Sequence, residues 1–305
     1  MSTPLTSGCD WFQRFRERHQ LPESYARTAE RYFFPLASLI AQRCASTRPL
    51  LVGINGCQGS GKSTLAQLLV VALEQLQLSA LAVSLDDFYL TRAQRQALAA
   101  STHPLLETRG VPGTHDLALM NATFESLLLA RDTRLRTILV PVFSKALDDR
   151  TDTAHWRVIE APVDVVIWEG WCLGVPPQTE AQLSTAINRF EETEDPNGLW
   201  RGFANEALCE YQPLFDRVDH WIMLQAPNFD CVYQWRLEQE QKLAAQSADG
   251  EMLMNPQQIM RFIQFYQRLT EWGFVSVPPR IDALFTLDAE RRIQSVSSPR
   301  REVRV

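Results

Sequence analysis

The sequence predicts an α/β fold in which helices cover both faces of a mostly parallel β-sheet. Short apolar runs alternate along the chain with segments of helical period, and the runs are apolar throughout rather than at every second residue. A strand that is apolar on both sides must be buried on both faces, as it is in parallel sheets. Right-handed crossover connections are expected between such strands.

The first part of the chain is predicted to be helical. In residues 11–48, apolar residues such as Tyr25, Phe33 and Leu39 recur near a period of 3.6. Pro35 interrupts the pattern, so we expect two helices or a kink, with Pro35 near the start of the second. Residues 1–48 are therefore expected to form an N-terminal helical layer on the main domain.

Strands and helices then alternate. A helical stripe at 63–77 follows the first strand, and the polar segment 178–215 is predicted to be an insertion of two helices on the rim of the sheet. Residues 293–305 lack an apolar pattern and are expected to be a loose tail. The six expected strands are 49–55, 80–87, 136–143, 164–170, 220–226 and 282–288.

Composition limits the possible partners and surroundings. The 305 residues are 45% apolar and 22% charged with a net charge of -6, which is typical of a globular protein and argues against broad binding to nucleic acid. The six cysteines form no C-x-x-C pair, and no apolar run approaches the length of a membrane span. We expect a cytoplasmic protein with reduced thiols, no nucleic-acid or membrane partner and an undetermined oligomeric state.

The segment "GCQGSGKST" carries the strongest functional signal. It matches the P-loop pattern G-x-x-x-x-G-K-[ST], between an apolar strand and an amphipathic helix. Glycines let backbone N–H groups converge on a phosphate, and the following helix adds its positive N-terminal end. The alternative is a glycine-rich turn without a ligand. The residues predicted to bind nucleotide are Gly56, Cys57, Gln58, Gly59, Ser60, Gly61, Lys62, Ser63 and Thr64.

Two strand ends carry carboxylates. The second strand ends near Asp86 and Asp87, and the fourth ends in Glu169. The carboxyl ends of parallel strands line the ligand crevice, so Asp86 can orient an attacking hydroxyl and Glu169 can hold Mg²⁺ together with the Ser63 hydroxyl. We favour Asp86 over Asp87 as the base, and the alternative is that the pair caps the following helix.

The order of several motifs resembles one family. The segments "GINGCQGSGKST", "SLDDFYLT", "RGVPGTHD", "WEGW" and "VYQWRLEQE" are similar to those of the D-glycerate 3-kinases, P-loop kinases related to uridine kinase, phosphoribulokinase and bacterial pantothenate kinase. The resemblance runs from about residue 50 to 290. It implies a P-loop NTPase fold for a kinase domain at 49–292, with ATP as donor and Mg²⁺ as cofactor.

The resemblance also implies roles for single residues. It makes Asp86 the catalytic base beside Lys62, and makes Arg236 a lid residue that closes over the phosphates. Arg236 can instead belong to a helix held by spaced Glu and Arg pairs. The resemblance implies the Mg²⁺ ligands Ser63 and Glu169. The residues expected at the acceptor are Asp86, Tyr89, Arg109, His115, Asp116, Lys145 and Arg150.

Two of these acceptor contacts have open alternatives. Arg109 or Lys145 can bind a substrate carboxylate, but the glycines of the "RGVPGTHD" loop are also compatible with simple turns, and Lys145 and Arg150 with solvated surface charges. Lys145 is one of only three lysines among the 30 cationic residues, with Lys62 and Lys242. A compact ammonium is therefore expected to matter at these positions.

Together these features predict an ATP-dependent kinase that phosphorylates a hydroxyl of D-glycerate. The alternatives are a related kinase acting on pantothenate, a sugar or a nucleoside, and an ATP-binding regulatory protein without catalytic activity. Asp86 and Glu169 favour a kinase, because nucleotide binding alone requires no base.

Overall fold

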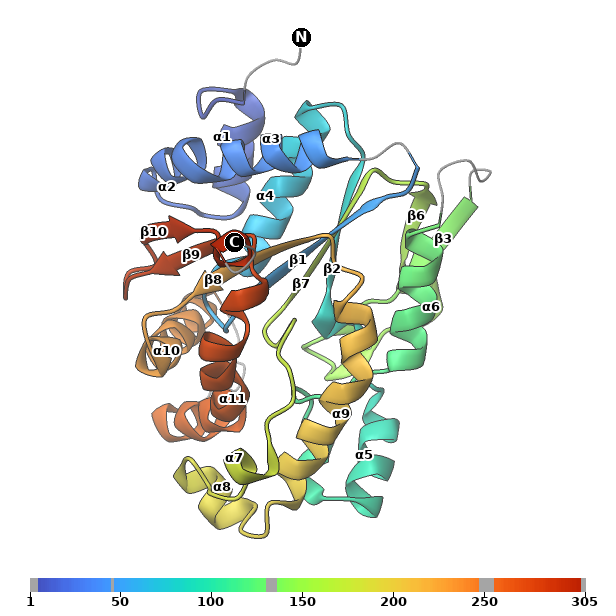
Figure 1. The fold of residues 1–305 in the computed structure, drawn as a ribbon, viewed down its shortest axis with the longest axis vertical. Coiled ribbons are helices and arrows are strands. Elements are labelled where there is room, and N and C mark those ends of the chain that lie inside the picture. The colour runs from blue at the N-terminus through green and yellow to red at the C-terminus, as the bar shows by residue number, and fades with distance from the viewer. Residues whose placement is uncertain (1–4, 45–46, 130–135, 247–254, 303–305) are drawn as a thin grey trace.

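The computed structural model describes residues 5–44, 47–129, 136–246 and 255–302. Its centre is a six-stranded sheet (Figure 1). Five neighbouring strands are parallel to one another, and the sixth, at one edge, is antiparallel. The predicted α/β fold with a mostly parallel sheet is confirmed. The order is β2 (Ala80–Ser84), β7 (Val165–Gly170), β1 (Leu50–Gly56), β8 (His220–Gln225), β9 (Ala283–Leu287) and β10 (Ile293–Ser297).

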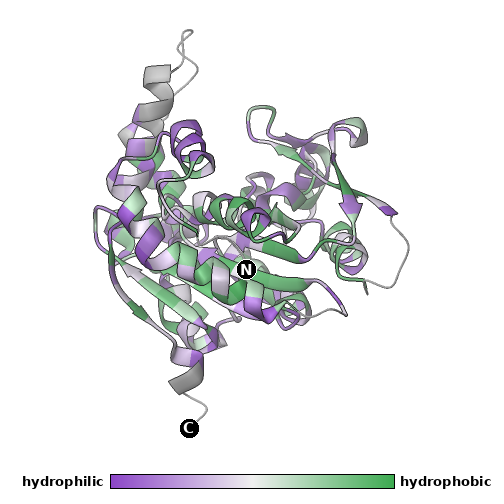
Figure 2. Ribbon diagram, turned by 90° about the horizontal axis from the view of Figure 1, so that it is seen from above, coloured by the Kyte–Doolittle hydropathy of each residue, from purple (hydrophilic) through white to green (hydrophobic). Residues whose placement is uncertain are grey.

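Helices cover both faces of this sheet, as Figures 1 and 2 show, and apolar strands lie at the centre. One face packs against α4 (Lys62–Gln75), α10 (Phe229–Gln246) and the N-terminal helices. The other face packs against α6 (Leu117–Leu127) and α9 (Leu199–Phe215). Helix α11 (Pro256–Ser276) contributes side chains to both clusters.

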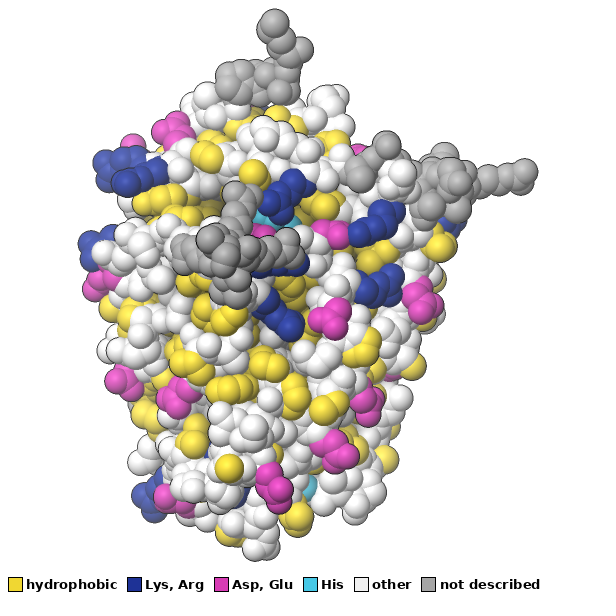
Figure 3. Space-filling view, in the orientation of Figure 1, with side chains coloured by type: hydrophobic (Ala, Val, Ile, Leu, Met, Phe, Trp, Pro, Cys, Tyr) yellow, Lys and Arg dark blue, Asp and Glu magenta, His cyan; other side chains and the backbone are white. Residues whose placement is uncertain are grey.

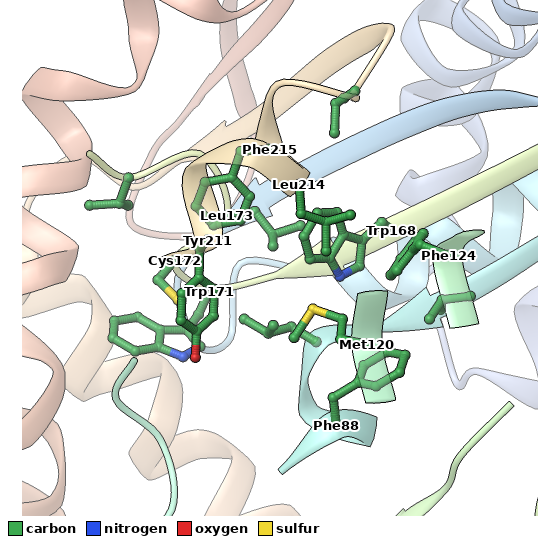
Figure 4. Close-up of a cluster of buried hydrophobic side chains, with 14 of the residues drawn as sticks. Phe88, Met120, Phe124, Trp168, Trp171, Cys172, Leu173, Tyr211, Leu214 and Phe215 are labelled. Atoms are coloured by element: carbon green, nitrogen blue, oxygen red, sulfur yellow. The ribbon is translucent and has the colours of Figure 1, made fainter. Parts of the chain in front are cut away.

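Strand β7 shows why the apolar runs predict a parallel sheet. Val165 and Ile167 belong to the hydrophobic cluster on one face, and Val166 and Trp168 belong to the cluster on the other. Successive side chains of a strand point to opposite faces, so both sets must be apolar when both faces are covered. Trp168 is fully buried, and its ring centroid lies 4.8 Å from that of Phe124 (Figure 4). Truncation of such a side chain costs about 3–5 kcal/mol.

The N-terminal helices are built into the core. They are α1 (Asp10–Arg18), α2 (Ser24–Thr28), a π-helical turn (Ala29–Phe33) and α3 (Phe34–Arg43). Pro35 lies in the first turn of α3, as expected, but α3 continues directly from the π-helical turn with helical backbone angles at Phe33 and Phe34. Its missing N–H therefore removes one hydrogen bond to the preceding turn, where the helix changes from π to α. Phe33 packs edge-on against Phe285 of β9, with ring centroids 5.8 Å apart.

The third predicted strand lies outside the central sheet, which corrects the prediction. Strand β3 (Arg136–Val140) pairs antiparallel with β6 (Arg157–Ala161) in a separate two-stranded sheet. Its burial alternates, since Ile138 and Val140 are buried whereas Leu139 is 45% exposed. An exposed leucine gives such a strand the appearance of a continuous apolar run. A smaller hairpin follows, made of β4 (Phe143–Ser144) and β5 (Asp149–Arg150).

Two further predictions need correction. The insertion 178–215 contains three helices, α7 (Glu180–Leu183), α8 (Arg189–Glu194) and α9, instead of two. The tail predicted to be loose begins with strand β10, which pairs antiparallel with β9 as the edge of the central sheet. The absence of an apolar pattern was misleading, because an edge strand is held by backbone hydrogen bonds to its neighbour and needs no apolar side chains.

Among the described residues, no helix is long and apolar enough to cross a membrane. In Figure 3 several basic side chains gather near the middle of the face shown, with acidic side chains beside them. The short elements are α5 (Arg92–Ser101), α12 (Pro299–Glu302) and the 3₁₀ turns Leu85–Phe88, Pro104–Glu107, Thr153–His155 and Pro278–Arg280.

Candidate active site

The phosphate loop connects the end of β1 to the start of α4. Gly59 has a φ of 77° and Gly61 a φ of 92°, in the left-handed region that disfavours side chains. A Cβ on Gly59 would also lie 2.6 Å from Cβ of Trp235. The loop therefore has the strand–loop–helix geometry that the motif predicts, and α4 presents its N-terminus at Lys62.

Two residues outside the motif hold this loop. Trp235 of α10 is fully buried against Gly59, and its indole Nε1 donates to the carbonyl of Ala289 at 2.7 Å. Arg291 donates from Nε to the carbonyl of Gly59 at 2.8 Å, and its guanidinium lies 5.0 Å from the centroid of the Trp235 ring. No role for Arg291 was predicted from the sequence. Its position beyond the carboxyl end of a parallel strand was the available signal.

Ser63 and Glu169 meet at the start of α4. The Ser63 hydroxyl donates to Oε1 of Glu169 at 2.8 Å, and Nζ of Lys62 lies 4.0 Å from Oε2. Glu169 is only 6% exposed, and its Oε2 has no hydrogen-bond partner among the described residues. A buried carboxylate oxygen without a donor is costly and suits a cation. Mg²⁺ binds through one or two carboxylates together with phosphates and water, so this pair fits it.

Asp86 lies in the 3₁₀ turn that follows β2. Its Oδ2 lies 2.7 Å from Nζ of Lys145, and the Tyr89 hydroxyl donates to Oδ1 at 3.2 Å. Burial alone would raise the pKa of Asp86, but the charges of Lys145 and Lys62 outweigh it and hold this pKa below its ordinary value. Two of the three lysines therefore act on one carboxylate; the side chain of Lys242 lies outside the described structure.

Asp87 has different surroundings. Its Oδ1 accepts from the backbone N–H of Phe143 at 3.3 Å, and Oδ2 lies 3.6 Å from Nη2 of Arg157. Neither aspartate caps α5, because Thr91 is the N-cap residue and forms a capping box with Gln94. The capping alternative is thus wrong, and Asp87 is a structural anchor for the β4–β5 hairpin.

His115 is buried beside Asp86. Its ring stacks on Tyr89 with centroids 4.4 Å apart, and Nδ1 lies 2.8 Å from the Tyr211 hydroxyl. Burial lowers the pKa of His115 to about 3, so the imidazole is neutral at physiological pH. Its Nε2 has no hydrogen-bond partner within the described structure. A neutral imidazole with one nitrogen unused can bind a polar group of a ligand.

Asp116 and Arg150 pair with each other. Oδ1 of Asp116 accepts from the N–H of Leu119 and caps α6, and Oδ2 lies 2.9 Å from Nη1 of Arg150. These contacts occupy both oxygens of the carboxylate and give both residues a structural part in holding the loop. Their predicted contacts with the acceptor stay predictions.

Arg109 forms an ion pair with Asp148. Asp148 also binds Arg95, whose Nη2 lies 3.0 Å from Oδ2, and Arg95 is fully buried. The Arg109 guanidinium lies 5.3 Å from the centroid of the Phe143 ring. Asp148 thus holds Arg109, one of the two cations expected to bind the acceptor, and no role for Asp148 was predicted from the sequence.

Gly110 is required by packing. Its φ is 146°, and a Cβ there would overlap the ring of Tyr266, whose hydroxyl donates to the carbonyl of Arg109 at 3.1 Å. The "RGVPGTHD" loop is therefore packed into the site between α9 and α11, since Gly113 also donates to Tyr211 at 3.1 Å. It is more than a simple turn.

Arg236 lies on α10, and its guanidinium is 5.1 Å from the centroid of the Phe262 ring of α11. The helix that was expected to form a lid thus packs on the phosphate loop through Trp235 and on α11 through Arg236. The predicted closure over the phosphates stays a prediction.

A phosphate loop beside a strand-end aspartate and a buried strand-end glutamate defines the chain as a P-loop kinase. Comparison with known proteins narrows this class. The chain is 35% identical over 228 residues to the "Uncharacterized kinase mug58" of Schizosaccharomyces pombe, covering 72% of this chain and 79% of that protein. It is 32% identical to the chloroplastic D-glycerate 3-kinase of Arabidopsis thaliana, covering 72% of this chain and 46% of that protein.

A solved structure agrees with these relatives. D-glycerate 3-kinase from Cryptococcus neoformans is 28% identical, with a TM-score of 0.72 over 89% of this chain and 98% of that chain. No protein-family model matches the chain. The chain belongs to the family of P-loop kinases that includes D-glycerate 3-kinase, and it is an ATP-dependent kinase.

Proposed function

We propose that this kinase transfers the γ-phosphate of ATP to a hydroxyl of D-glycerate. The contact that carries the proposal is the pair of Asp86 with Lys145, beside Lys62 of the phosphate loop. In this proposal the ionised carboxylate and the two ammonium groups surround the point at which the hydroxyl of a hydroxy acid meets the γ-phosphate. The names of the Arabidopsis and Cryptococcus relatives support D-glycerate as the acceptor.

In this proposal Asp86 accepts a hydrogen bond from the acceptor hydroxyl and takes its proton as the oxygen attacks the γ-phosphorus. The bond from the γ-phosphorus to the bridging oxygen breaks, and ADP leaves. A lowered pKa makes Asp86 a weak base, which suits a loose transition state in which bonding to the nucleophile is slight. Asp86 therefore acts mainly by positioning the hydroxyl.

Charge neutralisation is the second task. The ammonium of Lys62 and the N-terminus of α4 stabilise the transferring phosphoryl group, and Arg236 adds charge when α10 closes over it. Ser63 and Glu169 would hold Mg²⁺, which neutralises phosphate charge when bound. Oε2 of Glu169, buried and without a hydrogen-bond donor among the described residues, supports this assignment.

The acceptor is held by the groups around Asp86. Lys145, which is 66% exposed, and Arg109, which is 28% exposed, are both accessible to a small carboxylate. The unused Nε2 of His115 binds a hydroxyl of the acceptor, and the Tyr89 ring stacks on the imidazole and keeps it in place. Charge-assisted bonds from an arginine or lysine to a carboxylate are the strong contacts in such a site.

The experiment that tests the proposal is a panel of acceptors in a coupled assay of ADP release. D-glycerate is expected to give the highest kcat/KM, compared with L-glycerate, pantothenate, sugars and nucleosides. Faster turnover of another acceptor would replace D-glycerate and retain the kinase. Tight ATP binding without release of ADP on any acceptor would instead indicate a regulatory ATP-binding protein.

A further inference from the structure

The hydroxyl of Tyr211 joins helix α9 to the "RGVPGTHD" loop and has no part in the proposed mechanism. Tyr211 lies near the end of α9 and is fully buried in the cluster of side chains that Figure 4 shows. The backbone N–H of Gly113 donates to the hydroxyl oxygen at 3.1 Å, and Nδ1 of His115 lies 2.8 Å from it. Through one hydroxyl, the predicted insertion thus contacts a residue expected at the acceptor.

The hydrogen bonds of this hydroxyl determine which nitrogen of His115 carries a hydrogen. A phenol has one hydrogen to donate, and its oxygen can also accept. The N–H of Gly113 can only donate, so the hydrogen of Tyr211 needs another partner. Among the described residues, that partner is Nδ1 of His115. A hydrogen on Nδ1 would leave the buried phenol hydrogen without an acceptor, which is costly. Nδ1 therefore accepts, and Nε2 carries the hydrogen.

Burial keeps both groups in the forms that this arrangement needs. It lowers the pKa of His115 to about 3, so the imidazole is neutral and one of its nitrogens can accept. It raises the pKa of Tyr211 above its ordinary value, so the phenol keeps its hydrogen at physiological pH. A neutral imidazole has two tautomers, and the hydrogen bond made by one nitrogen selects between them.

The selected tautomer makes Nε2 a buried hydrogen-bond donor next to the proposed base. Nε2 has no hydrogen-bond partner among the described residues. Tyr89 connects His115 to Asp86, because its backbone forms a β-bridge with His115, its ring stacks on the imidazole, and its hydroxyl donates to Oδ1 of Asp86. The charge of Asp86 also acts on the pKa of His115, against the effect of burial. An acceptor and a donor of hydrogen bonds therefore adjoin each other at this point of the site.

We propose that Tyr211 is a positioning residue: it keeps the hydrogen of His115 on Nε2, and this N–H donates to the oxygen of the hydroxyl that Asp86 binds. The proposal rests on the proposed function, because it needs a hydroxyl as the nucleophile. A hydroxyl has one hydrogen and two lone pairs. Asp86 binds the hydrogen and His115 binds one lone pair, which leaves the other lone pair for the γ-phosphorus. With the hydrogen on Nδ1 instead, Nε2 would compete with Asp86 for the single hydrogen, and the hydroxyl would bind in an unproductive orientation.

The tautomer can be measured without any acceptor. In ¹⁵N-labelled protein, the chemical shifts of the imidazole nitrogens separate a nitrogen that carries a hydrogen from one that does not. Loss of one signal in His115→Gln identifies His115 among the five histidines. A hydrogen on Nε2 is expected in the unsubstituted protein, and a mixture of the two tautomers in Tyr211→Phe, which removes only the hydroxyl. A hydrogen on Nδ1 in the unsubstituted protein overturns the proposal, and so does an unchanged tautomer in Tyr211→Phe. The first of these results needs no variant of Tyr211 to fold.

The control for Tyr211→Phe is Tyr266→Phe. Tyr266 is also buried, and its hydroxyl donates to the carbonyl of Arg109 in the same loop at 3.1 Å. This variant removes a hydroxyl that holds the loop but does not bond to His115. It is therefore expected to leave the tautomer unchanged. A tautomer shifted equally in both variants would show that any loosening of the loop moves the hydrogen, and would overturn the role of Tyr211.

Steady-state kinetics with ATP and D-glycerate test the consequence. In Tyr211→Phe, kcat is expected to fall by the fraction of His115 that loses the hydrogen from Nε2, about twofold for an equal mixture, with KM nearly unchanged. His115→Met, which has no donor, is expected to lose about tenfold or more in kcat, and His115→Gln, whose amide can donate, is expected to lose less. A shifted tautomer with unchanged kcat, or equal losses in His115→Met and His115→Gln, overturns the donor role. Failure of the unsubstituted protein to phosphorylate D-glycerate overturns the proposed function, whereas the tautomer of His115 is decided by the NMR measurement in either case.

Discussion

Lys145 holds Asp86 in an ion pair at the carboxyl end of β2, with Nζ 2.7 Å from Oδ2. The β4–β5 connection brings this lysine to a carboxylate far away in sequence. Burial alone would raise the pKa of Asp86, but the charge of Lys145, together with that of Lys62, lowers it. Lys145 therefore contributes the largest charge that lowers the pKa of the proposed base, and this relationship gives the first two predictions.

The first prediction concerns the base. Asp86→Asn is expected to bind ATP with nearly normal affinity and to lose at least about a hundredfold in kcat. The amide loses the ion pair with Lys145 and one acceptor oxygen, so it positions the hydroxyl poorly, and it cannot take the proton. Steady-state kinetics and calorimetry with ATP measure the two effects. The control is Asp87→Asn, which alters a residue bound to Phe143 and Arg157 and should lower the melting temperature more than kcat. Near-normal turnover by Asp86→Asn would contradict the assignment.

The second prediction concerns pH. Because the pKa of Asp86 is lowered, its carboxylate stays ionised below the ordinary aspartate range, and activity is lost only as the pH falls through this lowered pKa. Lys145→Ala removes the largest charge that opposes burial, so the acidic limb of the kcat/KM profile should move to higher pH. Lys145→Arg keeps the charge and should keep the limb. An acidic limb that does not move in Lys145→Ala would refute the coupling.

The third prediction concerns the phosphate loop. Gly59→Ala combines a φ of 77° with a clash against Trp235, whereas Gly61→Ala has a φ of 92° but open space for its Cβ. Both lose about 1–3 kcal/mol from backbone strain. Gly59→Ala should lose more, because α10 must also shift. Urea unfolding of the two variants measures the difference in the free energy of unfolding. Equal losses would show that Trp235 can move away from the new methyl group without a loss of stability.

The fourth prediction concerns the metal. Glu169→Gln keeps the shape of the side chain but removes its charge, so the Mg²⁺ concentration for half-maximal activity should rise about tenfold. Mg²⁺ binding in the presence of ADP, followed by calorimetry, gives a readout apart from turnover. Glu191→Gln is the control, since Glu191 is also buried but pairs with Arg268, away from the phosphate loop. A Mg²⁺ dependence shifted equally in both variants would argue against Glu169 as a ligand.

Several features of the site could be read from the sequence because short segments determine them. The phosphate loop is one short segment that begins at Gly56. Its turn needs positive φ angles at Gly59 and Gly61, which glycine adopts without strain, so the glycines themselves indicate the turn. Asp86 and Glu169 follow directly from the rule that parallel strands end at one edge of the sheet. The same rule would have found Arg291, had the turn after β9 been included.

Other features depend on contacts between distant segments. The sequence does not show that Asp148 joins Arg95 to Arg109, because these residues meet only when the β4–β5 hairpin packs on α5 and on the "RGVPGTHD" loop. Strand β10 is similar, since its pairing with β9 needs only backbone groups. The predicted strand 136–143 was placed in the wrong sheet for a related reason: strand partners are chosen by tertiary packing.

The sequence by itself determined the fold class, the phosphate loop and the two strand-end acids, because these depend on local backbone geometry and on periodic burial. Only the tertiary structure decided which aspartate meets Lys145, that His115 is buried and neutral, and that Tyr211 of α9 binds Nδ1 of this imidazole. The physical reason is that charge pairing and desolvation depend on distances through space, which the folded chain sets between residues far apart in sequence.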